Sequence, residues 1–239
     1  ARRCGGQDLA ASGFRELGYV DALAGRRPAA AAQLAAALEI VGEDDDGLAG
    51  IHAVMGFNLV DWGRVEEGIH HYDLSLRHAR AAGNLRRQIW SLGLGGWGQL
   101  AAGRADVAVR WLSDCLKMVD QTRWISFRPW PLAVLGEARL RQRQDPEPLR
   151  AVLEDAFALS CQLDDPCWES AVARSLALSF DAAGDTERSL HWLAEAHERC
   201  LRETDAFVGL LVQILADQAE ICLRDGRIEQ AGEFAREVL

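Results

Sequence analysis

The sequence contains very little lysine, methionine, tyrosine or proline, and it has no long run of apolar residues. Among 239 residues, Lys117 is the single lysine, and there are two methionines, two tyrosines and six prolines. A helix that spans a bilayer needs about 20 consecutive apolar residues, so we predict no membrane span. The first residues, Ala-Arg-Arg-Cys-Gly-Gly, lack the apolar core of a secretory signal. These absences together favour a cytoplasmic protein.

Positive charge is also scarce. The chain carries 36 Asp and Glu against 26 Lys and Arg, and its formal net charge is −10. Binding to nucleic acid without regard to sequence requires a basic surface that neutralises phosphates, so we predict no direct nucleic-acid partner. Every basic residue except Lys117 is an arginine. A GC-rich genome and selection for arginine chemistry both explain that skew.

Closely paired cysteines and histidines of the kind that bind metals are missing. His70 and His71 are adjacent and point in different directions on a helix, while His191 and His197 are six residues apart. An oxidised scaffold would be denser in cysteine, and a zinc site would show a Cys-x-x-Cys pair. We therefore predict no metal and no cofactor, and we expect most cysteines to be buried small side chains. For Cys167, near a predicted helix start, redox sensing is the alternative to burial. The six cysteines are Cys4, Cys115, Cys161, Cys167, Cys200 and Cys222.

What the chain does contain is enough apolar sequence for a folded protein. Apolar residues make up 49% of it, which argues against disorder. The chain begins without Met and finishes at Leu239 inside an apparent helix, so we expect a fragment of a larger protein.

Glycines recur at a nearly constant interval. Gly25, Gly63, Gly103, Gly184 and Gly226 are separated by 38, 40, 81 and 42 residues. The interval of 81 is two periods with an unmarked turn between them, near Arg143 and Gln144. A fixed period of this length is typical of a repeat protein, and it predicts six units.

Other positions recur relative to these turn glycines. Small residues precede them by seven positions: Gly18, Gly56, Gly96, Ala177 and Ala219. Small residues follow them by five positions: Ala30, Gly68, Ala108, Ser189 and Ala231. Mostly larger apolar residues follow them by nine positions: Leu34, Tyr72, Leu112, Leu193 and Ala235. In the fourth unit, Gly136, Leu149 and Leu153 take these three places after a one-residue insertion.

The pattern has a direct physical interpretation. A small residue on each of two helices lets their backbones approach closely, and the larger residue one turn later fills the seam. The glycine then ends the first helix in a left-handed conformation. Polar segments separate the units, and in one of them Asp165 is an expected N-cap with Pro166 in the first helical position.

This pattern resembles the tetratricopeptide repeat over residues 11–239, although the usual repeat has about 34 residues and this period is near 40. The resemblance implies an all-α fold, a right-handed superhelical solenoid of about six helix–turn–helix repeats. Longer repeats of this kind resemble the sensor arrays of large ATP-binding LuxR-family transcriptional regulators and related signal-transduction ATPases. In that family an ATPase module precedes the array and a helix-turn-helix output often follows it; neither is present in this sequence. The expected repeats are residues 11–42, 49–82, 89–122, 129–163, 170–203 and 212–239 of one domain, 1–239.

The first helix of each pair lines the inner wall of such a superhelix. On its face away from the packing positions, residues spaced by three and then four form one stripe in each of four units. These residues are Gly50, Ala53 and Phe57 in unit two, Trp90, Gly93 and Trp97 in unit three, Trp130, Ala133 and Glu137 in unit four, and Ala171, Arg174 and Leu178 in unit five. The stripes predict a tryptophan-lined groove with polar groups beside it. The alternative is that the tryptophans are core residues between helices. The residues predicted to contact a ligand are Phe57, Trp90, Gly93, Trp97, Trp130, Glu137, Arg141 and Arg174.

Two further motifs have weaker interpretations. Residues 93–98 formally match the dinucleotide fingerprint Gly-x-Gly-x-x-Gly, but that fingerprint has meaning only after a strand. Here it lies inside an expected helix, where close packing, space for a ligand or a local helix break would explain the glycines. In the second motif, residues 127–131, Pro129 and Pro131 fit a helix start. A structural linker is the favoured interpretation, and the alternative is that Arg128 at the edge of the groove contacts an anion or an aromatic ring.

These observations favour a non-catalytic binding or sensing module, and not an enzyme. Lys117 lacks a phosphate-binding loop, and no Gly-x-Ser-x-Gly elbow occurs. The expected partners are a protein, peptide or small-molecule effector in the groove and other domains of the parent protein, with homo-oligomerisation left open. An interaction scaffold without a small-molecule effector is the alternative, and an enzyme is the remote one.

Overall fold

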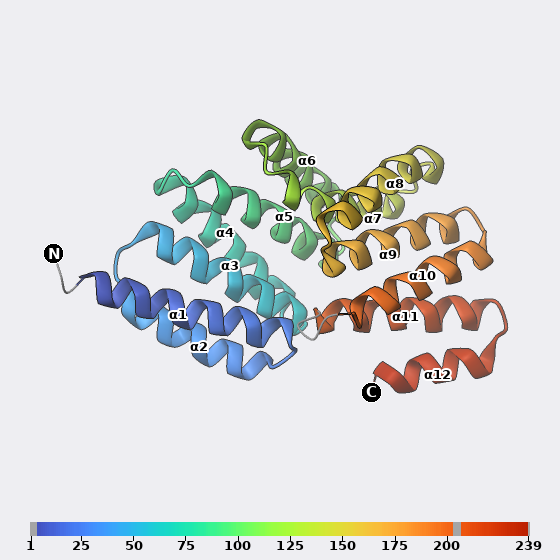
Figure 1. The fold of residues 1–239 in the computed structure, drawn as a ribbon, viewed down its shortest axis with the longest axis horizontal. Helices are drawn as coiled ribbons and strands as arrows, with labels where there is room; N and C mark the ends of the chain where they lie inside the picture. The colour runs from blue at the N-terminus through green and yellow to red at the C-terminus, as the bar shows by residue number, and fades with distance from the viewer. Residues whose placement is uncertain (1–3, 203–206, 239) are drawn as a thin grey trace. The chain divides into compact units, whose positions relative to one another are not determined.

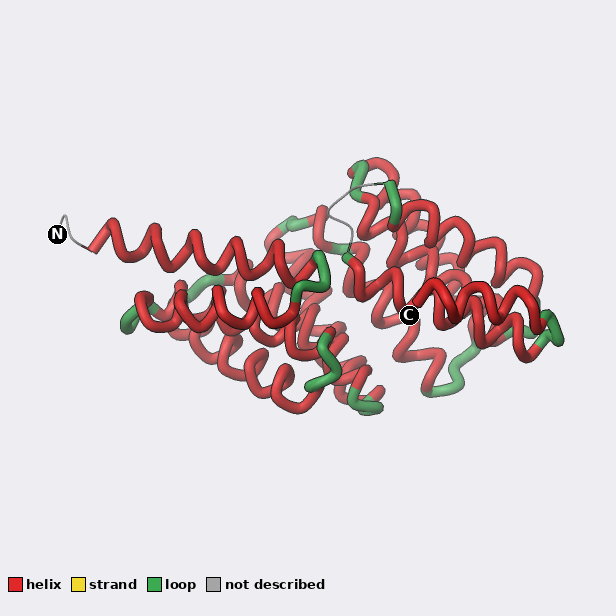
Figure 2. Tube along the Cα trace, turned by 90° about the horizontal axis from the view of Figure 1, so that it is seen from below, coloured by secondary structure: helices red, strands yellow, loops and turns green. Residues whose placement is uncertain are grey.

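The structure is a computed structural model that describes residues 4–202 and 207–238, with side chains from residue 9 onward. Within these ranges all regular structure is helical, and Figure 2 shows helices joined by short loops without a strand. The prediction of an all-α fold is confirmed. The described helices are too short or too polar to cross a membrane.

The chain forms two compact units, Ala1–Trp124 and Ile125–Leu239. The helices of the first unit are α1 (Cys4–Leu23), α2 (Arg27–Val41), α3 (Asp45–Asp61), α4 (Val65–Ala81), α5 (Leu85–Ala101) and α6 (Ala105–Thr122). Those of the second unit are η1 (Ile125–Phe127), α7 (Pro129–Arg141), α8 (Pro146–Leu163), α9 (Pro166–Ala182), α10 (Thr186–Cys200), α11 (Val208–Arg224) and α12 (Ile228–Val238).

Consecutive helices pack as pairs, which Figure 1 shows from α1–α2 to α11–α12. The first helices of neighbouring pairs also contact each other, α1 with α3 and α3 with α5 in the first unit, and α7 with α9 and α9 with α11 in the second. The six predicted helix–turn–helix repeats are therefore present. That they form one domain across both units stays a prediction.

The turns inside the pairs have the predicted left-handed conformation. Gly63 has φ 81°, and the amide after it, of Arg64, donates to the Leu59 carbonyl at 2.8 Å. This bond satisfies a carbonyl that the ending helix would leave without a partner. The unmarked fourth turn uses the same geometry without a glycine, because Arg143 has φ 58°. The interval of 81 residues therefore contains two periods, as predicted.

The positions predicted to pack are buried at the helix seams. A methyl group on Gly56 would lie 3.0 Å from the Gly68 carbonyl oxygen, so only glycine allows α3 and α4 this approach. The larger residues nine positions after the turn are fully buried at Leu34, Tyr72 and Leu112. They pack on the small residue of the preceding helix, as Tyr72 does on Gly56. The register inferred from the turn glycines is thus the packing register.

The glycine-rich segment of the third unit belongs to an unbroken helix, α5. A methyl group on Gly95 or Gly96 would meet the side chains of Trp111 and Leu112, which reach across from α6. These two glycines therefore allow close helix packing, and the suggested local helix break is wrong. No strand precedes the segment in the described chain, so the dinucleotide fingerprint has no structural basis here.

Helix starts follow the predicted chemistry. Asp165 accepts a hydrogen bond from the Trp168 amide at 3.1 Å, and Pro166 is the first residue of α9. Pro129 is the first residue of α7, as its fixed φ favours. Both predicted boundaries are confirmed.

Candidate functional site

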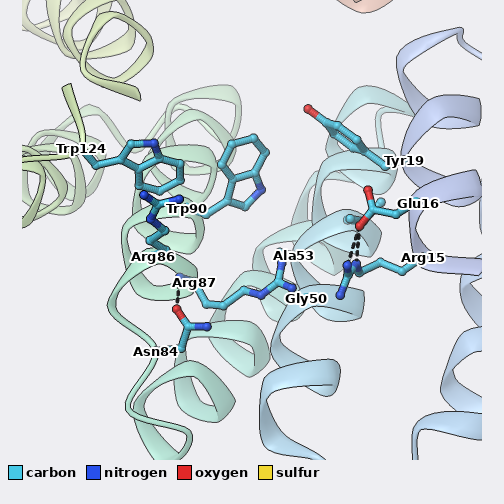
Figure 3. Close-up of a pocket in the computed structure, with 11 residues that line it drawn as sticks. Arg15, Glu16, Tyr19, Gly50, Ala53, Asn84, Arg86, Arg87, Trp90 and Trp124 are labelled. Atoms are coloured by element: carbon cyan, nitrogen blue, oxygen red, sulfur yellow. Dashed lines mark hydrogen bonds and ion pairs between the residues drawn. The ribbon is translucent and has the colours of Figure 1, made fainter. Parts of the chain in front are cut away.

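A cavity of about 400 Å³ opens on the face that the first helices form in the first unit. Its walls come from α1, α3 and α5, with Trp124 following α6 (Figure 3). Small residues of α3, Gly50 and Ala53, leave the space. The residues that line it are Arg15, Glu16, Tyr19, Gly50, Ala53, Val54, Asn84, Arg86, Arg87, Trp90 and Trp124. We call this cavity the first-unit pocket.

One side of the first-unit pocket is cationic. Arg15 of α1 and Arg87 of α5 point toward each other over Gly50 of α3, as Figure 3 shows. A methyl group on Gly50 would lie 2.9 Å from Cζ of Arg87 and 3.0 Å from Nη1 of Arg15. The missing side chain of Gly50 therefore makes room for both guanidinium groups.

Acidic residues balance part of this charge. Glu16 accepts a hydrogen bond from Nε of Arg15 at 3.0 Å. Arg87 reaches Asp46 only at 3.8 Å, which is an ion-pair distance but too long for a hydrogen bond. Burial, followed by the charge of Arg15, lowers the pKa of Arg87. The guanidinium group of Arg87 is thus half-buried beside a like charge and has capacity to donate further hydrogen bonds.

The other side of the first-unit pocket is aromatic. Trp90 and Trp124 stack with ring centroids 6.3 Å apart and an interplanar angle of 20°. Tyr19 meets Trp90 edge-on at 6.2 Å, and the guanidinium carbon of Arg86 lies 5.1 Å from the Trp124 ring centroid. Trp90 and Trp124 are both half-buried, so part of each residue is exposed to solvent. Such rings bind flat apolar groups at little cost in side-chain entropy.

The predicted ligand-contacting residues of the first unit lie at different depths. Trp90 lines the pocket, whereas Phe57 and Trp97 are buried, with 3% and 8% of their surfaces exposed. Phe57 packs between Tyr19 and Trp97, at ring-centroid distances of 5.9 Å to each. Gly93 is also buried in α5. Phe57, Gly93 and Trp97 are therefore buried and outside the pocket lining. A ligand contact by these three residues stays a prediction.

The predicted residues of the second unit fall in two groups. Trp130 is buried, and its ring centroid is 5.4 Å from that of Trp168. Glu137, Arg141 and Arg174 join one ion-pair network with Asp217. That Trp130 shares a surface with Trp90 stays a prediction.

The network connects α7, α9 and α11 through Arg174. Arg174 donates to Glu137 at 2.9 Å and to Asp217 at 2.6 Å, and Arg141 donates to Glu137 at 2.8 Å. Burial opposes the charge on Glu137, but the two arginines outweigh it and lower the pKa of Glu137. Burial likewise opposes the charge of Arg174, and the two carboxylates raise its pKa. These charged groups form hydrogen bonds and ion pairs with one another. A contact between them and a ligand stays a prediction.

Sequence reasoning missed Arg15, Tyr19, Arg87 and Trp124. In units two to five the predicted stripe lies 13, 10 and six positions before the turn. In the first unit the last two of these positions are Arg15 and Tyr19, so the same rule extended by one unit would have found them. Arg87 lies one helical turn before Trp90 on the same face. Trp124 follows α6 and has no place in the repeat pattern, so no periodic signal could have found it.

Histidines form a second titratable group, between α3 and α4. Nδ1 of His52 lies 2.9 Å from Nδ1 of His71, and the ring of His52 stacks with that of His78 at 5.8 Å. One nitrogen of the close pair donates and the other accepts, which requires neutral imidazole on the accepting side. Burial, followed by His71 and His78, lowers the pKa of His52 to about 4. Among the described residues no group of three or more His, Cys, Asp or Glu side chains is arranged to hold a metal ion.

This arrangement predicts an acid-sensitive first unit. An unfolded histidine binds a proton near pH 6.5, whereas His52 in the folded protein resists protonation down to about pH 4. The unfolded state therefore binds more protons between these values, and stability is lost as the pH falls from about 6.5 towards 4. Thermal unfolding of the wild type and of His52→Asn across this range measures the effect. We expect the thermal unfolding midpoint of the variant to fall less steeply than that of the wild type as the pH is lowered. The same pH dependence in both proteins would contradict the lowered pKa of His52.

Most described cysteines have the predicted structural role. Cys115, Cys200 and Cys222 are buried, Cys167 is half-buried and Cys161 is exposed, while the side chain of Cys4 lies outside the described residues. Burial raises the pKa of the Cys167 thiol, which disfavours the thiolate that redox sensing requires.

Comparison with known proteins places the fold. No protein-family model and no curated protein matches the chain. Aspartyl phosphate phosphatase F from Bacillus subtilis is 14% identical, with a TM-score of 0.74 over 97% of this chain and 59% of that one. A Rap protein complexed with competence and sporulation factor is 13% identical, with a TM-score of 0.70 over 96% and 74%. The TPR-like repeats of a putative kinesin light chain from Podosopora anserina are 17% identical, with a TM-score of 0.53 over 82% and 94%.

The chain has a tetratricopeptide-like repeat fold. This confirms the resemblance inferred from the turn glycines and the small residues. At these identities the similarity establishes the fold alone, and the chain spans less than two thirds of the length of phosphatase F.

Proposed function

We propose that this tetratricopeptide-like chain is a non-catalytic binding module and that the first-unit pocket is its ligand site. The observation that carries the proposal is the pairing of two converging arginines with two stacked, partly open tryptophans around one cavity. Ligand sites combine apolar and aromatic walls with a few well-placed polar groups in this way. The similar Rap structure, which is a complex with competence and sporulation factor, supports the idea that such a fold can present a ligand site.

The test compares variants that alter the pocket with one that does not. Ala53→Phe fills the cavity from α3, and Trp90→Ala removes one aromatic wall. Trp62→Ala is the matched control, because Trp62 is 40% exposed and lies outside the pocket lining. A library of aromatic fragments and short peptides is screened by ligand-observed NMR against all four proteins. Far-ultraviolet circular dichroism checks that the helices are intact.

We expect hits on the wild type and on Trp62→Ala that are lost in Ala53→Phe and weakened about tenfold or more in Trp90→Ala, as for a central aromatic contact. Hits whose affinity is the same in all four proteins would overturn the proposed site. A protein partner that binds Ala53→Phe as well as the wild type would favour the interaction scaffold instead.

The finer proposal is that this module senses an effector within a cytoplasmic transcriptional regulator similar to the LuxR-family ATPases. Its support is the repeat period near 40 residues, longer than that of the usual tetratricopeptide repeat. The gene around this segment tests it. An upstream phosphate-binding loop and a downstream helix-turn-helix are expected, and a gene with neither would reject this parent.

A further inference from the structure

We propose that the first-unit pocket selects a monoanionic carboxylate joined to a flat apolar group, and that Glu16 neutralises Arg15 until such a ligand displaces it. This inference rests on the proposed function, and it names the chemical class of the ligand.

The arginine pair is arranged for a shared anion. Arg15 and Arg87 come from different repeats and meet over Gly50, with their guanidinium groups near one point above α3. The two positive charges repel each other, and an anion between them would attract both guanidinium groups. Each guanidinium fork matches the two oxygens of a carboxylate.

The charge around the pair favours a single negative charge on the ligand. Arg15, Arg86 and Arg87 line the pocket together with one carboxylate, Glu16. Asp46 stands outside the lining, 3.8 Å from Arg87, where Asn84 holds it by a 2.6 Å hydrogen bond. Arg86 lies over the Trp124 ring and not at the pair. Once Glu16 has left, Arg15, Arg87 and Asp46 together carry a net charge of +1, which a carboxylate monoanion balances and a dianionic phosphate exceeds.

Glu16 is placed as a displaceable substitute for that ligand. One oxygen of its carboxylate, Oε1, accepts hydrogen bonds from both Nε and Nη2 of Arg15, and these are the bonds that a ligand carboxylate would replace. The Glu16 side chain is 62% exposed, while that of Arg15 is only 15% exposed. An exposed acid contributes little through such a pair, so Glu16 can rotate into solvent while the better buried Arg15 stays in place.

The aromatic wall lies beside the arginine pair. Trp90 lies one helical turn after Arg87 on α5 and stacks with Trp124. Tyr19 lies one helical turn after Arg15 on α1. A planar group attached to the carboxylate would therefore reach these rings. Helical spacing thus places the aromatic side chains next to the arginines, and a matching ligand carries its flat apolar group next to its carboxylate.

Gly50 makes the convergence of the two arginines possible. Alanine there would lie within about 3 Å of both guanidinium groups, and these are the mobile ends of long side chains that can move apart. Because alanine favours a helix interior over glycine, Gly50→Ala is expected to keep or raise the unfolding midpoint while it weakens the anion site. A purely structural glycine would not show that combination.

The experiment measures binding of 2-naphthoate and of its neutral counterpart 2-naphthamide by isothermal titration calorimetry. Wild type should prefer naphthoate by about tenfold or more, as for a charge-assisted contact. Arg87→Gln should abolish that preference. Glu16→Gln should tighten naphthoate binding several-fold without changing naphthamide binding, and Gly50→Ala should weaken naphthoate binding several-fold.

The outcomes separate this inference from the proposed function. Equal binding of naphthoate and naphthamide, lost for both in Ala53→Phe, would overturn the carboxylate and leave the pocket as a ligand site. Tighter binding of 2-naphthyl phosphate than of naphthoate would also overturn the ligand class. Absence of naphthoate binding in a wild type that binds other fragments in the pocket would reject the inference alone. Absence of every pocket ligand would reject both.

Discussion

Replacing Arg174 with methionine is expected to lower the free energy of unfolding by about 3–5 kcal/mol, the usual effect of removing one partner from a buried ion pair. Arg174 has 11% of its side chain exposed and bridges Glu137 of α7 to Asp217 of α11. The substitution leaves both carboxylates largely buried without their shared cation. Of the two, Glu137 keeps an ion-pair partner among the described residues, Arg141, whose side chain is half exposed.

Urea denaturation of the wild type and of Arg174→Met measures this effect. Lys117→Met is the matched control, since Lys117 forms an exposed pair with Asp114 and exposed pairs contribute little. Replacing the three buried residues of the network together, as Glu137→Leu, Arg174→Met and Asp217→Leu, should recover much of the loss, because no buried carboxylate then remains without its cation. The fourth member, Arg141, has a half-exposed side chain. If Arg174→Met were as mild as the control, Arg174 would be available for the ligand contact that the sequence suggested.

Gly68→Ala should also destabilise the protein, by about 1–3 kcal/mol, as overpacking in a tight interface does. Glycine-to-alanine changes inside helices normally stabilise by about 0.5–1 kcal/mol. At Gly68 the added methyl group would lie 2.8 Å from the Gly56 carbonyl oxygen and 3.0 Å from the Val60 amide nitrogen. Both are backbone atoms of α3, so α3 and α4 would have to separate.

The comparison for Gly68→Ala is Gly13→Ala, made in the same protein. Gly13 lies in α1, is exposed, and has no neighbouring atom within 4 Å of the added methyl position. We therefore expect Gly13→Ala to raise the thermal midpoint and Gly68→Ala to lower it. A stabilising Gly68→Ala would mean that the helices have room to spare, and the small-residue rule would lose its physical basis.

The helix pairs could be predicted because their signals are local. Gly63 ends a helix through its own backbone freedom, and Gly56 and Gly68 determine how closely two helices joined by a three-residue segment can pack. Arg143 adopts the same turn without a glycine, and it was located only because the period is regular. Each of these features lies within one repeat and its turn, and the comparison of several repeats located them.

The candidate site could be predicted only in part. The stripe rule identified Gly50, Ala53 and Trp90 as residues of one face, and all three line the first-unit pocket. The same rule treated Trp97 as equivalent to Trp90, but Trp97 is buried against Phe57. Helical spacing determines the face on which a residue lies, and the neighbouring helices determine its depth.

The amino-acid sequence by itself determined the helical pairs, their turns and their packing register, because these depend on residues within about forty positions of each other. The tertiary structure alone decided that Arg15 and Arg87, 72 positions apart, meet over Gly50, and that Arg174 is held between Glu137 and Asp217. Side chains from three separate helices create each of those environments. Charge and burial there depend on distances through space, which the spacing of residues along the chain does not specify.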